Sequence, residues 1–98
     1  MPVKVTPSSG NIFLDLGFSP EEADNLRLRA ELMIQIHRLI EERGLTQSQA
    51  AELFGVSQPR VSDVIRGKIG RFTIDSLVNM LAKVGVRVEL RLAVPAGS

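Results

Sequence analysis

The stretch SQPRVSD at residues 57–63 brings together side chains that donate and accept hydrogen bonds in defined pairs. The amide of Gln58 has a donor beside an acceptor, which matches N6 and N7 of adenine, and the guanidinium of Arg60 suits a two-pronged contact to guanine. Asp63 could accept from N4 of cytosine, but an ion pair with Arg60 or Arg66, three residues away on either side, is the simpler role for it. The chemistry available here is the reading of base-pair edges, with these predicted base contacts: Gln58, Pro59, Arg60, Ser62 and Asp63.

Positive charge gathers around the same stretch. The chain of 98 residues has a formal net charge of only +1, which argues against a general polyanion binder. Four basic residues nevertheless fall between positions 60 and 71, against the single acid Asp63. Cations and hydroxyls suit phosphates, which hold a protein in register on DNA and make binding salt-dependent, and backbone N–H groups at helix starts add to this. We expect phosphate contacts from Ser57, Arg66, Lys68 and Arg71.

Glycine, proline and capping residues delimit the two helices that must position these side chains. Thr46 followed by Gln49 has the pattern of a capping box, which predicts a helix through Phe54. Gly55 is typical of a left-handed turn after a helix. Ser57 is then the cap of a second helix, with Pro59 in its first turn, where the missing N–H is harmless. The apolar spacing predicts these inward residues: Ala50, Leu53 and Phe54 in the first helix, and Val61, Val64 and Ile65 in the second.

Three further segments complete the helical part. Ser19 and Pro20 start a long helix that continues to Arg43, and Thr73 caps another that continues to Val84. Apolar residues between positions 12 and 18 predict a short segment docked on the domain. We therefore expect an arm with this docked segment at residues 1–18, a helical domain at 19–85 with its turn motif at 45–67, a strand at 86–93 and a tail at 94–98.

The last element changes period, because VRVELRL alternates strictly between apolar and charged residues. A lone strand cannot satisfy its backbone hydrogen-bonding groups. Its partner is either the apolar stretch near Ile12 or the same strand of a second copy, and we favour the second copy, which gives a two-fold dimer. The predicted dimerisation residues are Val86, Val88, Leu90 and Leu92.

The motif LTQSQAAELFGVSQPRVSDVIRG resembles the helix-turn-helix of the XRE family, the phage-repressor-like DNA-binding domains. We therefore expect a mainly α, phage-repressor-like bundle of five helices or fewer, with the terminal strand pairing across a dimer. The resemblance also implies that Gln47 bonds a phosphate and braces Gln58, which reaches base edges. From Gly10 to Leu92 the chain is further similar to HigA-like antitoxins, which pair with RelE-like or HigB-like toxins. That similarity implies a homodimer on a palindromic operator that represses its own operon and neutralises a toxin.

Other classes of function find little support in the sequence. The chain has no cysteine and one histidine, His37, so we expect no metal site, no cofactor and no enzymatic activity. It has neither a membrane-spanning run nor an export signal, which predicts a cytoplasmic protein. Two rivals to the antitoxin remain: a stand-alone phage-type repressor without a toxin, and a protein-interaction module whose DNA motif is vestigial.

Overall fold

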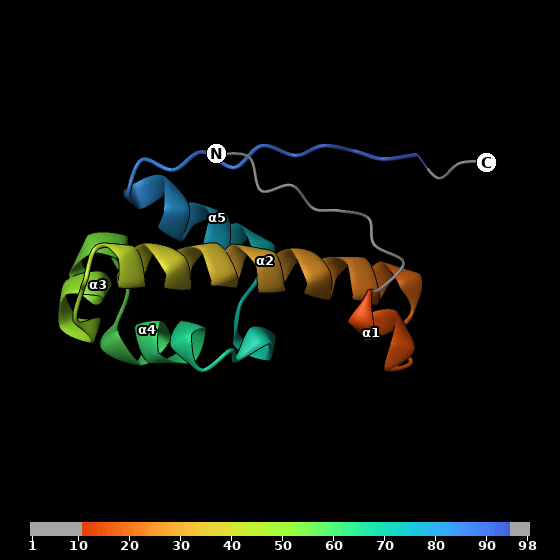
Figure 1. The fold of residues 1–98 in the computed structure, drawn as a ribbon, viewed down its shortest axis with the longest axis horizontal. Helices are drawn as coiled ribbons and strands as arrows, with labels where there is room; N and C mark the ends of the chain where they lie inside the picture. The colour runs from red at the N-terminus through yellow and green to blue at the C-terminus, as the bar shows by residue number, and fades with distance from the viewer. Residues whose placement is uncertain (1–10, 95–98) are drawn as a thin grey trace.

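The computed structural model of the chain describes residues 11–94, so the predicted arm before Asn11 and the tail after Val94 lie outside the described residues. Within this range the chain is mainly helical, as predicted (Figure 1). Five α-helices and one 3-10 helix follow one another: α1 (Ile12–Asp15), α2 (Pro20–Glu42), α3 (Gln47–Phe54), α4 (Gln58–Ile65), η1 (Ile69–Arg71) and α5 (Ile74–Lys83).

Helix starts fall where the capping residues predict them. The Ser19 hydroxyl accepts the N–H of Glu22 at the head of α2. At the head of α3 the capping box is complete, because Thr46 Oγ1 accepts the N–H of Gln49 at 3.1 Å and Gln49 Oε1 accepts the N–H of Thr46 at 2.9 Å. Thr73 caps α5. These local bonds satisfy N–H groups that a helix start leaves without partners.

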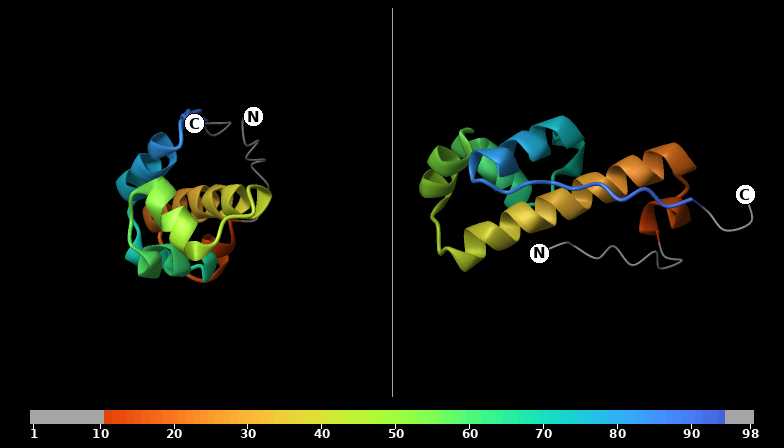
Figure 2. Two further views of the ribbon diagram at one scale, coloured as in Figure 1. Left: turned by 90° about the vertical axis from the view of Figure 1, so that its left-hand side faces the viewer. Right: turned by 90° about the horizontal axis from the view of Figure 1, so that it is seen from above.

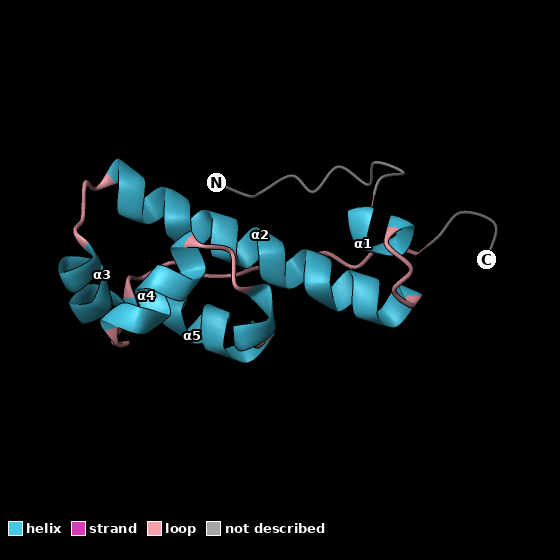
Figure 3. Ribbon diagram, turned by 90° about the horizontal axis from the view of Figure 1, so that it is seen from below, coloured by secondary structure: helices cyan, strands magenta, loops and turns pink. Residues whose placement is uncertain are grey.

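The long helix α2 is the axis of the fold, and the remaining helices lie along it (Figures 1 and 3). Helices α4 and α5 both pack on α2, α3 packs on α4 and α5, and α1 contacts the other end of α2. Their contact buries a single apolar core. The largest completely buried side chains are Phe54, Phe72, Ile36, Leu77, Leu81 and Val61. Burial of this surface is the main stabilising contribution.

One predicted core residue is misplaced. Leu53 is 36 % exposed, whereas Ala51, which the family resemblance places inside, is 7 % exposed. The buried stripe of α3 runs through Ala50, Ala51 and Phe54. At about 100° per residue the directions of Ala50, Phe54 and Ala51 span about 100° of the helix surface, and Leu53 lies about 60° beyond the Ala50 edge of that span, so its side chain is only partly covered.

The predicted docked segment is the one-turn helix α1. Asn11 caps it by accepting the N–H of Phe13 at 3.0 Å. The ring of Phe13 meets that of Phe18 edge to face, with 6.3 Å between centroids. Much apolar surface stays outside this contact, since Ile12 is 61 % and Leu16 68 % exposed.

The predicted C-terminal strand is not supported. Residues 86–94 form no strand, and the part of the chain that the structure describes contains none (Figure 3). The segment runs back along α2 towards α1 without pairing (Figures 1 and 2). A strand needs a neighbouring backbone to complete its hydrogen bonds, and residues 11–94 of the single chain pair none with this segment. Of the predicted dimerisation residues, Val86 and Val88 pack against the chain's own core, while Leu90 and Leu92 are exposed.

Candidate nucleic-acid interface

A glycine corner fixes α4 against α3. Gly55 closes α3 with φ +69° and ψ +35°, a left-handed conformation that glycine adopts without strain. Two residues later the Ser57 hydroxyl accepts the N–H of Arg60 at 3.4 Å and so starts α4. Val61 and Val64 are buried on the side of α4 that faces the core. Because its apolar side is held by the core, the opposite side of α4 must face solvent.

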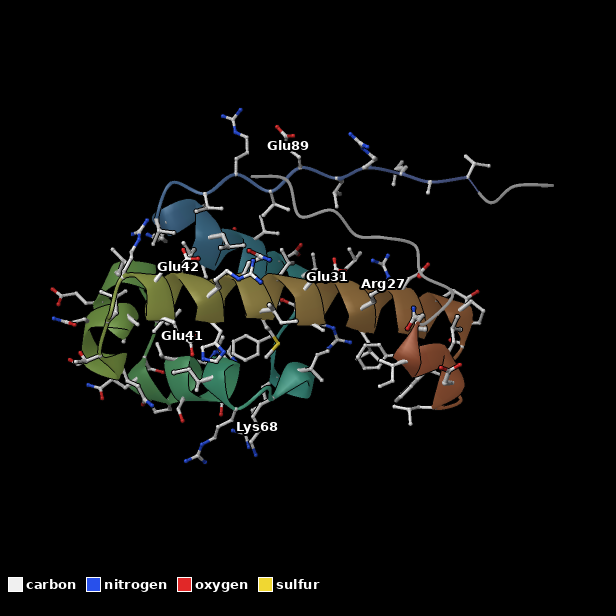
Figure 4. The ribbon with its side chains drawn as sticks, in the orientation of Figure 1. Arg27, Glu31, Glu41, Glu42, Lys68 and Glu89 are labelled. Carbon is white, nitrogen blue, oxygen red and sulfur yellow. The ribbon has the colours of Figure 1, made fainter. Side chains whose placement is uncertain are left out.

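The exposed side carries most of the residues predicted from the sequence. Gln58 and Pro59 are exposed in the first turn of α4, and Arg66 and Lys68 are exposed after its end. Figure 4 shows Lys68 pointing away from the body of the protein. Ser62 is half-buried. The amide of Gln58 therefore lies at the N-terminus of α4, and the exposed cations Arg66 and Lys68 lie after its C-terminus.

Arg60 does not extend towards solvent as a base contact would. Its Nη1 donates to the carbonyl oxygen of Arg71 at 2.6 Å, and its guanidinium lies 4.6 Å from the centroid of the Phe72 ring. Phe72 is itself 2 % exposed. A cation over an aromatic face is attracted by the ring quadrupole. Arg60 thus ties α4 to the turn that follows η1 in the described conformation.

Asp63 pairs with a residue that helical spacing did not suggest. Its Oδ2 lies 3.4 Å from Nη1 of Arg71, eight residues away, instead of pairing with Arg60 or Arg66. The carboxylate side chain is 15 % exposed and the arginine side chain 64 %. The pair neutralises the acid that would repel phosphates. It also commits part of Arg71, which was predicted as a free phosphate contact.

A further arginine, missed in the sequence, supports the same surface. Arg29 of α2 donates through Nη1 to the carbonyl oxygens of Ile69 and Phe72, both at 3.1 Å, and through Nε to Asn25 at 2.7 Å. The bonds to Ile69 and Phe72 join residues that are 40 and 43 positions apart in the sequence. No local pattern indicates such a contact. Arg29 and Arg60 together hold the η1 segment that carries Lys68 and Arg71.

The first turn of α3 contributes the remaining predicted contact. Gln47 is exposed at the first position of α3. No side-chain hydrogen bond joins Gln47 to Gln58 among residues 11–94, so the bracing contact implied by the family resemblance is absent from the described structure. Both glutamines keep their amide groups available for a ligand.

Comparison with known proteins agrees with this geometry. The model of a family described as a helix-turn-helix domain matches residues 12–93. A solved structure that carries the name XRE family transcriptional regulator is similar, with a TM-score of 0.70 and 25 % sequence identity, over 79 % of this chain and 86 % of that one. No curated protein matches.

The family match, over residues 12–93, includes every helix from α1 to α5. Helix-turn-helix motifs place their second helix in the major groove of DNA, and here that helix is α4. No helix in the described range is long and apolar enough to cross a membrane. By its sequence and by the arrangement of α3 and α4, the chain belongs to the helix-turn-helix domain family.

Proposed function

We propose that this protein is a sequence-specific DNA-binding transcriptional repressor that inserts α4 into the major groove. The observation that carries the proposal is the polar side of α4, which faces solvent with Gln58 exposed at its head. A glutamine amide makes two hydrogen bonds to adenine in the major groove. The name of the similar solved structure, a transcriptional regulator, supports the same function.

The surrounding residues divide into direct contacts and positioning residues. Gln47, Arg66 and Lys68 are exposed and would bind phosphates, which contributes affinity and salt dependence. Arg60 and Asp63 are engaged within the protein, so in this proposal they orient the interface. In this proposal Gln58 is the main residue that contacts bases.

Two copies would be needed to read a palindromic operator. In helix-turn-helix dimers the recognition helices enter successive major grooves about 34 Å apart. We expect half-sites separated by one helical turn. Pairing through the C-terminal segment would bring the two domains together.

The test is binding to the DNA upstream of the protein's own gene. Gln58→Ala should lower affinity for that DNA by about 1–3 kcal/mol while leaving affinity for unrelated DNA unchanged. Asn79→Ala is the matched control, because Asn79 is an exposed amide on α5. Equal affinity of Gln58→Ala and wild type, with no preference for the upstream DNA, would overturn the base-reading role.

We further propose that the repressor is the antitoxin of a RelE-like or HigB-like toxin. The support is apolar surface that the single chain leaves uncovered on α1 and α2, where Leu14 is 46 % and Ile34 54 % exposed. Beside it lies a groove of about 360 Å³ between α1, α2 and α4, lined in part by Phe13, Ile34 and Ile65. Contiguous exposed apolar surface marks protein interaction sites.

This part of the proposal is tested with the neighbouring gene. Its product should copurify with the protein when the two are coexpressed, and Ile34→Asp should abolish copurification without changing DNA binding. Ile34 is suitable because it is 54 % exposed on α2 and lines the groove together with Ile65, an apolar residue of α4, and with none of the polar residues proposed to contact DNA. A neighbour unlike a small ribonuclease, or one that does not bind, would favour a stand-alone repressor.

A further inference from the structure

We propose that residues 86–94 of two copies pair as antiparallel strands in one defined register, centred on Leu90. The inference deepens the proposed two-copy arrangement and rests on it. It names the contact, the residues that face one another and the charges that select them.

The segment has the properties of an uncovered strand edge. Among residues 11–94, Val86 is the last to donate a backbone hydrogen bond, at 3.0 Å to Leu81, and no backbone hydrogen bond involves residues 87–94. Leu90, Leu92 and Val94 are 74 %, 90 % and 84 % exposed. A row of free backbone groups beside exposed apolar side chains is a template for pairing with another chain.

The segment already keeps the alternation of a strand. Val86 and Val88 pack on the core, while Arg87 and Glu89 between them are exposed. Figure 4 shows Glu89 pointing away from α2. Residues directly opposite in an antiparallel pair point to the same face, so apolar residues must oppose apolar residues. This condition requires a symmetric pair to centre on a residue, and the longest overlaps belong to centres at Glu89, Leu90 and Arg91, followed by Val88 and Leu92. A centre at Arg91 places Arg91 opposite itself and leaves Val86 without a partner, and a centre at Leu92 leaves both Val86 and Val88 without partners.

Charge and length then select among these centres. A centre at Glu89 places Glu89 opposite itself and Arg87 opposite Arg91, and like charges directly opposite are destabilising. A centre at Val88 leaves Leu92 and Val94 without partners. A centre at Leu90 places Glu89 of each copy opposite Arg91 of the other, which gives two pairs of opposite charge. It also gives every residue from 86 to 94 a residue opposite it in the other copy. It also matches the ends, because Gly85 precedes the segment and Pro95, which has no N–H, follows it.

This register also covers the exposed apolar side chains. Leu92 lies opposite Val88 of the second copy, and Val94 lies opposite its Val86. Val86 and Val88 pack on their own core. The exposed end of each segment therefore extends the core of the other copy, which gives the pairing an apolar driving force.

Single cysteines test the register, since the chain contains none of its own. Leu90→Cys lies on the two-fold axis, where directly opposite Cβ atoms are about 4.5–5.5 Å apart, within reach of a disulfide. Under mild oxidation this variant should cross-link to a covalent dimer. Glu89→Cys and Arg91→Cys are the matched controls: each alone should stay largely monomeric on a non-reducing gel, because identical residues are about 7–8 Å apart diagonally, but an equimolar mixture should cross-link.

Charge exchange gives a second measurement on reduced protein in the absence of DNA. In sedimentation equilibrium, Arg91→Glu should weaken the dimer about tenfold or more, and the double variant Glu89→Arg/Arg91→Glu should restore it. Arg87→Glu should change it less than about threefold, because Arg87 faces Ala93.

Each other outcome overturns the inference. Self-cross-linking of Glu89→Cys, or a larger effect from Arg87→Glu than from Arg91→Glu, assigns a different register. A wild-type dimer that Leu90→Cys does not cross-link pairs through another surface. A monomer at micromolar concentration removes the pairing altogether; since DNA binding is measured separately, a monomer that still selects its DNA would leave the base-reading proposal standing.

Discussion

Replacing Arg60 by alanine should destabilise the fold, because the structure assigns its side chain to internal contacts. The substitution removes the stacking of the guanidinium on Phe72 and the hydrogen bond to the Arg71 carbonyl. The stacking contributes about 0.5–1 kcal/mol at a partly exposed site, and the hydrogen bond about 0.5–1.5 kcal/mol. The free energy of unfolding should therefore fall by about 1–2.5 kcal/mol.

Urea unfolding followed by circular dichroism at 222 nm measures this change. Helix content is the suitable signal, because the chain has neither tryptophan nor tyrosine. Protein concentration is held constant, since a dimer would make stability depend on it. Arg66→Ala, at an exposed position after α4, is the matched control and should shift stability by less than about 0.5 kcal/mol. Arg60→Lys should fall between wild type and alanine, because lysine keeps a cation near the ring but loses the planar fork.

Binding to DNA distinguishes positioning from base reading. If Arg60 orients the surface, Arg60→Ala should weaken binding to the upstream DNA and to unrelated DNA by similar factors. A loss confined to the upstream DNA, with stability within about 0.5 kcal/mol of wild type, would refute the internal role and restore Arg60 as a base contact.

Three further substitutions test how the surface is supported. Arg29→Ala removes two hydrogen bonds to the η1 segment and should lower the free energy of unfolding by about 1–3 kcal/mol in the same urea assay. Arg38→Ala, at an exposed position of α2, is its control and should lower it by less than about 0.5 kcal/mol. Phe54→Ala, which empties a core position that is 1 % exposed, should cost about 3–5 kcal/mol and lower the thermal midpoint correspondingly. Gly55→Ala should lower the free energy of unfolding by about 1–2 kcal/mol, because alanine is strained in the left-handed conformation of Gly55. An effect no larger than that of Gly70→Ala, a glycine without a positive φ, would contradict the role of Gly55 in the turn between α3 and α4.

Local features of the fold were predictable because their physical causes are local. The caps at Ser19, Thr46, Ser57 and Thr73 need only a side-chain oxygen and an N–H group two or three residues away, and all four are present. Gly55 likewise needs only its own conformational freedom. The mainly helical fold and its helix-turn-helix followed from these signals.

Contacts between distant segments were not predictable from spacing. Asp63 was expected to pair within its helix, yet the turn after η1 brings Arg71 closer. Arg60 has the chemistry of a guanine contact, and nothing in its sequence neighbourhood shows that a buried phenylalanine lies within reach. Both contacts support the positioning role that we propose for Arg60 and Asp63.

The terminal strand failed for a different reason. Its alternating pattern describes which face each residue occupies, but strand formation depends on a second backbone. The alternation is present at residues 86–89 without the pairing. The sequence could specify a strand only together with its partner.

Footprinting on the DNA upstream of the gene tests the central claim most directly. With a probe of purine N7, which reports adenine as well as guanine in the major groove, wild-type protein should protect two short segments whose centres lie about 34 Å apart, one helical turn. Gln58→Ala should lose the base protection in both segments while backbone protection persists at low salt. Protection confined to the minor groove, or an identical base footprint for Gln58→Ala and wild type, would contradict the assignment of α4 as the reading helix.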